Sequence, residues 1–181
     1  MKISKPITVL ATAVLLLAII PSASVFTQEN PKLSDPEVAS VAVMANQIDI
    51  SYGEIAKERS KNEDILKFAE TMINDHKAVI AQAAALAKKL GVTPKDNAVS
   101  QKLLADAEKT KTLLRSKSGK AFDKAYIDNE VAYHKAVIAA VEGLLIPETD
   151  NGELKSLLQN VVPALKTHLE HAVMVQSKIS K

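Results

Sequence analysis

The stretch ILKFAETMINDHKAVIAQAAALAKKL, residues 65–90, is the clearest indication of the fold. Its apolar residues recur three and four positions apart, which is the spacing that places side chains on one face of an α-helix. Ser60 to Glu63 has the pattern of a capping box before this stretch. Gly91 and Pro94 are the residue types that end a helix and prevent its continuation. The stretch therefore predicts one long helix with a single apolar face.

Three more segments predict helices of similar length, over residues 35–59, 120–145 and 153–179. Asp35-Pro36-Glu37 has the pattern of a helix start, and Pro147 should end the third of these helices. Pro163 lies inside the last one and should kink it, because proline lacks a backbone donor.

The lengths of the connections predict how these helices are arranged. The first and second helices, and the third and fourth, are joined by short turns and should be antiparallel neighbours. A long connection, with an extra short helix expected over residues 99–114, joins the two pairs. The fold class is therefore all-α, and residues 35–181 should form a ferritin-like four-helix bundle with one long crossover containing an extra short helix.

Composition supports this class and excludes several functions. Hydrophobic residues make up 47% of the chain but only three Phe and three Tyr are present, which favours helices over a sandwich of strands. The absence of cysteine excludes disulfides, thiolate metal sites, a cysteine nucleophile and a lipid-modified N-terminal cysteine. Of 23 basic and 21 acidic residues, Lys2 and Lys5 supply the excess, so the remaining chain is neutral and no nucleic-acid partner is expected.

The N-terminus has the pattern of an export signal. Lys2 and Lys5 precede an apolar run over residues 7–20, which Pro21 and small residues follow. The run is shorter than the 20 or so residues that a spanning helix needs. We expect a signal peptide over residues 1–24, a flexible leader over 25–34, and an exported protein in the periplasm or cell envelope. An uncleaved anchor is the alternative, and no other segment reaches spanning length.

Three of the four histidines are expected to meet inside the bundle. His76, His134 and His168 lie within the apolar stripes of three helices and near their midpoints, while His171 falls at a stripe edge. Asp49 lies near the midpoint of the first helix, and Glu130 lies one turn before His134. Imidazoles with a carboxylate suit zinc, copper or iron, so these five residues are a candidate metal site, with Glu130 as a ligand or a support for His134. The alternative is a metal-free buried polar layer.

The sequence favours a protein that is not an enzyme. No phosphate-binding loop, catalytic triad or zinc-protease motif occurs, and no catalytic residue is assigned. A di-iron oxidase would need Glu three residues before a ligand histidine, but Ile73, Val131 and Leu165 occupy those positions. Two hypotheses follow, which are a metal-binding bundle for storage, sensing or redox protection, and a non-catalytic structural or stress-related envelope protein.

Four segments resemble a known family, namely IDISYGEIA at 48–56, KFAETMINDH at 67–76, GKAFDKAY at 119–126 and PALKTHL at 163–169. They are similar to the family called domain of unknown function 4142, over about residues 36–179. The resemblance implies an exported bacterial protein, often labelled an outer-membrane protein, with a ferritin-like fold. It also implies an acid at Asp49 and histidines at His76, His134 and His168, with Tyr52 where many members have leucine. It implies no activity.

Overall fold

Residues 32–180 are described by a computed structural model, and they form five long helices with no strand among them. The long helices are α1 (Asp35–Arg59), α2 (Glu63–Leu90), α3 (Ala98–Arg115), α4 (Gly119–Ala140) and α6 (Gly152–Ile179). A π-helical turn, η1 (Val141–Leu145), and the short α5 (Ile146–Glu148) extend α4. The expected signal peptide over residues 1–24 lies outside the described residues, as does most of the expected leader over 25–34.

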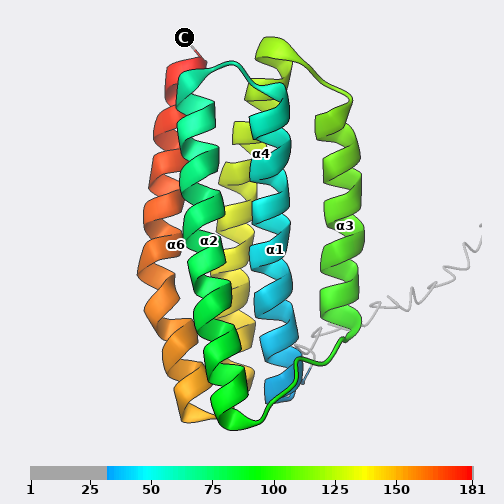
Figure 1. The fold of residues 1–181 in the computed structure, drawn as a ribbon, viewed down its shortest axis with the longest axis vertical. Coiled ribbons are helices and arrows are strands. Elements are labelled where there is room, and N and C mark those ends of the chain that lie inside the picture. Colours follow the sequence, from blue (N-terminus) through cyan, green and yellow to red (C-terminus); the bar gives the residue numbers. More distant parts are fainter. Residues whose placement is uncertain (1–31, 181) are drawn as a thin grey trace, which may run out of the picture.

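Four of the helices form the predicted bundle. α1 packs against α2 and α4, and α6 packs against the same two helices. α3 runs along the outer side of α1 and carries the chain from the lower end of α2 to the upper end of α4 (Figure 1). α2 and α4 therefore run in the same direction, and each has an antiparallel partner joined to it by a short turn. The structure confirms the all-α bundle with one crossover and an extra helix within it.

Two helix starts differ from the sequence prediction. Asn62 caps α2, and its Oδ1 accepts hydrogen bonds from the backbone N–H groups of Asp64 and Ile65. The capping box predicted at Ser60 is wrong, because Ser60 ends α1 and its Oγ donates to Asp123 Oδ1 at 2.6 Å. α1 is capped by Ser34, one residue earlier than predicted.

Pro147 and Pro163 both lie within helical backbone. The end predicted before Pro147 is wrong, because helical backbone continues through η1 and α5 to Glu148. Pro147 lies in the three-residue α5, directly after the π-helical turn. Pro163 lies inside α6, as predicted, and the helix continues on both sides of it.

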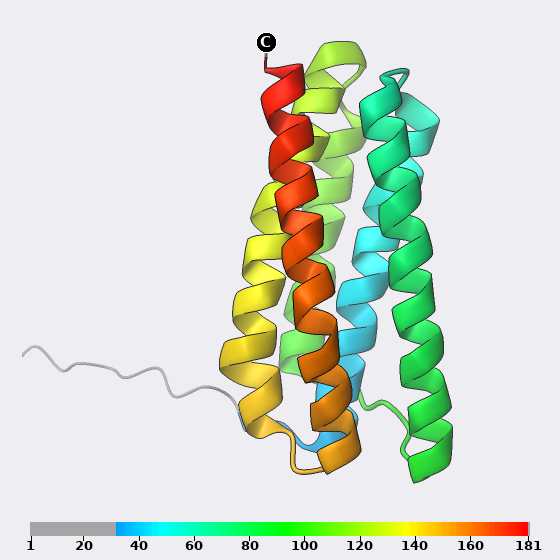
Figure 2. The same cartoon turned by 90° about the vertical axis from the view of Figure 1, so that its left-hand side faces the viewer.

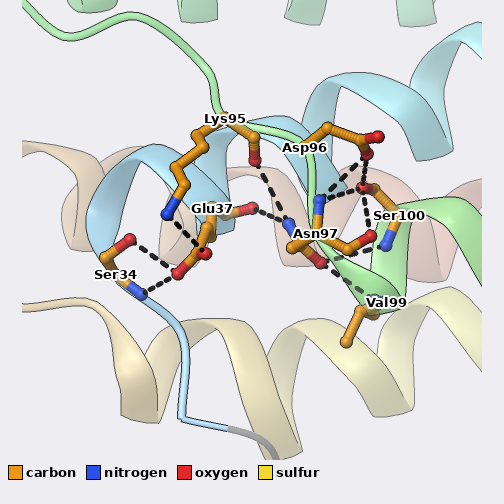
Figure 3. A network of polar contacts seen from close by, with 7 residues as sticks. All are labelled: Ser34, Glu37, Lys95, Asp96, Asn97, Val99 and Ser100. Atoms are coloured by element: carbon orange, nitrogen blue, oxygen red, sulfur yellow. Dashed lines mark hydrogen bonds and ion pairs between the residues drawn. The ribbon is translucent and has the colours of Figure 1, made fainter.

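A polar network fastens the connection between α2 and α3 to the start of α1 (Figure 3). The Glu37 carboxylate accepts from the backbone N–H of Ser34 at 3.0 Å and pairs with Lys95 Nζ at 3.2 Å. These contacts with Ser34 and Lys95 lower the pKa of Glu37 to about 2. Asn97 caps α3, accepting from the backbone N–H of Ser100, and its Nδ2 donates to Glu37 O at 3.2 Å. The connection between α2 and α3 is thus held beside the start of α1.

The core divides into two clusters, one above and one below the middle of the bundle. We call residues 48–76, 114–134 and 168–179 the closed half, and residues 33–47, 77–94 and 135–167 the open half. In the closed half all four bundle helices bury apolar side chains, and α2 contributes Ile65, Phe68, Ala69 and Met72. In the open half buried apolar residues come from α1, the α4–η1 segment and α6, together with Leu33. No residue from Lys77 to Val99 is buried.

Candidate metal centre

Three histidines meet where the two halves join. His76 on α2, His134 on α4 and His168 on α6 are buried, and their ring centroids lie 5.3–5.9 Å apart. Each residue offers a ring nitrogen within 4.8 Å of the other two. Each histidine lies in the apolar stripe of its helix, so the packing that buries the stripe also turns the ring inward. The convergence predicted from helix midpoints is present.

The fourth bundle helix supplies a carboxylate at the same level. Asp49 of α1 is buried, and its Oδ2 lies 3.4 Å from His76 Nε2 and 3.6 Å from His134 Nε2. The ligands of a tetrahedral zinc ion, with bonds of about 2.0–2.1 Å, lie about 3.3–3.4 Å from one another. The three atoms are therefore spaced almost as ligands of one ion would be.

Hydrogen bonds orient the rings of His76 and His134 from their far sides. Nδ1 of His76 donates to Asn46 Oδ1 at 2.7 Å, and Nδ1 of His134 donates to the backbone oxygen of Glu130 at 3.0 Å. Since a neutral imidazole has one N–H, the proton at Nδ1 leaves Nε2 with a free lone pair. In both rings this Nε2 is buried without a hydrogen-bond partner.

His168 follows the same rule with its two nitrogens exchanged. Its Nε2 donates to Asp75 Oδ2 at 2.9 Å, while its Nδ1 is buried and unpartnered. Both oxygens of Asp49 are also buried without a partner. Unpaired buried polar atoms are costly and uncommon, so a group of five at one point marks this cluster as a candidate binding site. An outer hydrogen bond that fixes the ring of each histidine is the usual arrangement around a protein-bound metal.

Burial sets the protonation of the cluster. It raises the pKa of Asp49 to about 8. It lowers the pKa of His76 to about 3, helped by the neighbouring His168 and His134. Burial also lowers the pKa of His134 to about 4, against the opposing effect of its hydrogen bond to the Glu130 backbone. At neutral pH Asp49, His76 and His134 are therefore uncharged, so the close approach of Asp49 to these two histidines is not an ion pair.

Glu130 lies behind His134 and not among the three histidines. Its Oε2 is 3.6 Å from His134 Nδ1, the nitrogen on the outer side of the ring. The side chain is fully buried, neither carboxylate oxygen has a partner, and burial raises its pKa well above the usual value. Asp49, Glu130 and His134 form a second group whose ligand atoms lie within 4.8 Å of one another. Because the Glu130 carboxylate lies on the outer side of the His134 ring, its position fits a group that orients this ring better than a direct metal ligand.

The structure thus brings together all five residues that the sequence singled out, and it leaves His171 aside. His171 packs edge-on against Phe68, with ring centroids 5.1 Å apart. Sequence reasoning missed Asn46 and Asp75. Asn46 precedes Asp49 by three residues on one helical face, a spacing that was available as a signal. Asp75 reaches a histidine on another helix, which no spacing along the chain reveals.

Comparison with known proteins adds a family and no activity. A family model described as "Domain of unknown function (DUF4142)" matches residues 21–175, and the chain belongs to this family. No curated protein sequence matches the chain. No solved structure matches it either. Among the described residues, no helix combines the length and the hydropathy needed to cross a membrane.

Proposed function

We propose that this member of the DUF4142 family binds one transition-metal ion at the centre of its bundle, through His76, His134, His168 and Asp49. The proposal rests on how the two ring nitrogens of each histidine are used. One nitrogen forms a hydrogen bond on the outer side of the cluster, and the other is buried without a partner. Such an arrangement leaves three lone pairs and a carboxylate without partners inside a folded core. A cation would satisfy all of them at once.

The donor set narrows the metal to zinc, copper or iron. Nitrogen and oxygen ligands suit these ions, and the chain has no cysteine to supply a thiolate. Spacings of 3.4 and 3.6 Å between Asp49 and two histidines favour a tetrahedral ion, for which zinc is the common case. We therefore propose zinc as the ion to test first, with copper and iron as competitors.

The proposed role is to hold the ion for storage or sensing in the periplasm or cell envelope. The four proposed ligands come from four different helices, so an ion would join them and stabilise the bundle. The compartment rests on the expected signal peptide over residues 1–24. Cell fractionation of the full chain tests it, because export predicts a shortened protein in the envelope fraction.

Isothermal titration calorimetry with zinc, copper(II) and iron(II) tests the metal site directly. A chain of residues 25–181 without a histidine tag is suitable, since the described fold begins at residue 32. We expect one ion per chain, with binding lost in His134→Ala and retained in His171→Ala. The matched control removes the one histidine that lies outside the cluster.

Two results would contradict the proposal. One is a chain that takes up no stoichiometric metal after reconstitution with each of the three ions. The other is equal metal binding by His134→Ala and His171→Ala, which would place the ion elsewhere. A cluster that binds no metal, and whose variants change only stability, would instead be a buried polar layer.

A further inference from the structure

A cavity of about 650 Å³ runs from the histidine cluster down through the open half. Its walls are formed by α1, α2, α4, η1 and α6, and most of its lining is apolar. It follows α2 from His76 to Leu90, a distance of about 21 Å at about 1.5 Å per residue. Ligand pockets in proteins commonly enclose about 300–1,000 Å³ and have mainly apolar walls, so this cavity has the size and character of a binding site.

The cavity exists because α2 cannot fill the space beside it. Between residues 81 and 87 this helix carries five alanines, with Gln82 and Leu86 as the only larger residues. Figure 2 shows the lower part of α2, in green, standing away from the other helices. Side chains as short as alanine cannot bridge such a gap, whereas Phe68 and Met72 fill the corresponding space in the closed half.

The foot of α2 is held in place although its side chains are not buried. Lys89 forms an ion pair with Glu153 at the start of α6. The backbone N–H of Lys95, just beyond α2, donates to Pro36 O of α1 at 2.9 Å. These contacts fasten α2 to both neighbouring helices below the cavity. The space is therefore part of the folded structure and not a frayed helix end.

Polar groups gather at the two ends of the cavity. At the inner end are the proposed metal ligands with Asn46 and Tyr133. At the outer end are four polar side chains from the ends of α1, α2 and α6 and from the α2–α3 connection, which are Asp35, Lys88, Thr93 and Asn151. Between these ends the lining is aliphatic. Lys88 and Thr93 are exposed, so the outer end faces solvent, whereas the proposed metal ligands at the inner end are buried. The cavity therefore matches a ligand with one polar head at the inner end and one long apolar chain.

We propose that the cavity binds a single-chain carboxylate amphiphile, a fatty acid, with its carboxylate at the histidine cluster and its chain along α2. The position of the head rests on the proposed function, because three neutral histidines and one aspartate leave a divalent ion with a net charge of +1. One carboxylate neutralises this charge, and zinc can accept a fifth ligand. The aliphatic lining stabilises the chain, because each CH₂ group that enters the cavity is removed from water.

Calorimetric titration of zinc-loaded and metal-free chain 25–181 with dodecanoate tests the inference. Saturable binding of one molecule per chain is expected. Dodecanol, which has the same chain and no charge, should bind the zinc-loaded protein at least about tenfold more weakly, because hydrogen bonds and contacts to a charged head are lost. Metal removal should reduce this preference for dodecanoate.

Variants on α2 locate the ligand. Ala83 is half-buried and lines the cavity, whereas Ala81 is exposed and does not line it. Ala83→Phe should fill the space and abolish dodecanoate binding, and the matched control Ala81→Phe should retain it. Ala140→Phe, on the opposite wall, gives a second cavity-filling variant if Ala83→Phe fails to fold, as judged by circular dichroism.

The outcomes separate the two proposals. Zinc binding without dodecanoate binding overturns the cavity inference and leaves the proposed function standing. Dodecanoate binding that is lost only in the cavity-filling variants supports the cavity as the binding site. If the same protein binds dodecanoate but no zinc, the proposed anchoring of the carboxylate by a metal is overturned. Equal binding to all variants overturns the inference. Light scattering gives a further test. If dodecanoate only converts a dimer into monomers, the inference is overturned, because a second copy of the chain would then occupy the cavity.

Discussion

The closed and open halves of this bundle use the same four helices and differ in what α2 contributes. Above the histidines, α2 buries Phe68 and Met72 between its neighbours, and an aromatic core forms around them. Below the histidines, α2 carries many alanines, and none of its residues is fully buried. The histidine cluster lies at the boundary. The difference shows that one amphipathic helix can serve as a core element along one half and as the wall of a cavity along the other.

The comparison also explains why polar residues are tolerated at mid-height. In the closed half, buried apolar side chains pack the four helices against one another. In the open half, the histidine cluster borders a cavity and not a second tightly packed core. His76, His168 and Asp49 then lie beside the packed core of the closed half and also line the cavity of the open half. The closed half would then supply most of the stability, and the open half would supply the space for binding.

The largest expected difference between the halves is the response to truncation of an α2 side chain. Phe68→Ala should lower the free energy of unfolding by about 3–5 kcal/mol, because it removes a fully buried ring and leaves a void. Leu86→Ala should cost about 1 kcal/mol or less, because Leu86 is only half-buried. Urea unfolding of both variants measures the difference, and similar losses would mean that the open half is packed as tightly as the closed half.

A close approach of α1 and α2 in the closed half gives a second test. A Cβ atom added at Gly53 would lie 2.8 Å from Ile73 Cγ1 and 3.2 Å from the backbone oxygen of Ala69. Gly53→Ala should therefore destabilise the protein by about 1–3 kcal/mol through overpacking. Thermal unfolding checks this, and an unchanged midpoint would show that the two helices separate without cost.

The boundary between the halves should respond to pH. Burial raises the pKa of Asp49 to about 8, while the unfolded value is 3.8, so the folded metal-free protein binds the extra proton. Its stability should therefore fall as pH rises from 6.5 to 8, by on the order of 1 kcal/mol. Urea unfolding across this range measures the effect. Asp49→Asn should weaken it, and stability that rises with pH would contradict the assigned protonation.

The smallest effect is expected in the open half, at Gly143 in η1. A Cβ atom there meets nothing within 4 Å, in contrast to Gly53. Gly143→Ala should stabilise the protein by about 0.5–1 kcal/mol, because alanine loses less backbone freedom in a helix. Thermal unfolding in parallel with Gly53→Ala is the measurement. A loss of stability would indicate that the π-helical turn requires glycine.

Much of the fold could be predicted because helices have a local signature. The apolar spacing of residues 65–90 and the turns around Gly91 and Asn151 placed the helices within a few residues. Errors fell at ends, where Ser34 and Asn62 compete with equally suitable neighbours as caps. The convergence of His76, His134 and His168 was also predictable, because helices of similar length that start and stop together bring their midpoints to one level.

Sequence by itself determined the helical class, the crossover and the level at which the histidines meet, because each depends on periodicity and connection length. Only the tertiary structure decided which nitrogen of each ring is free, since Asn46 and Asp75 act across helices. It alone decided that the Glu130 carboxylate lies on the outer side of the His134 ring, 3.6 Å from Nδ1. It also decided that the alanines of α2 border a cavity, because a void depends on how far apart the helices are held, and contacts between residues distant in the sequence, such as Lys89 with Glu153, hold the foot of α2.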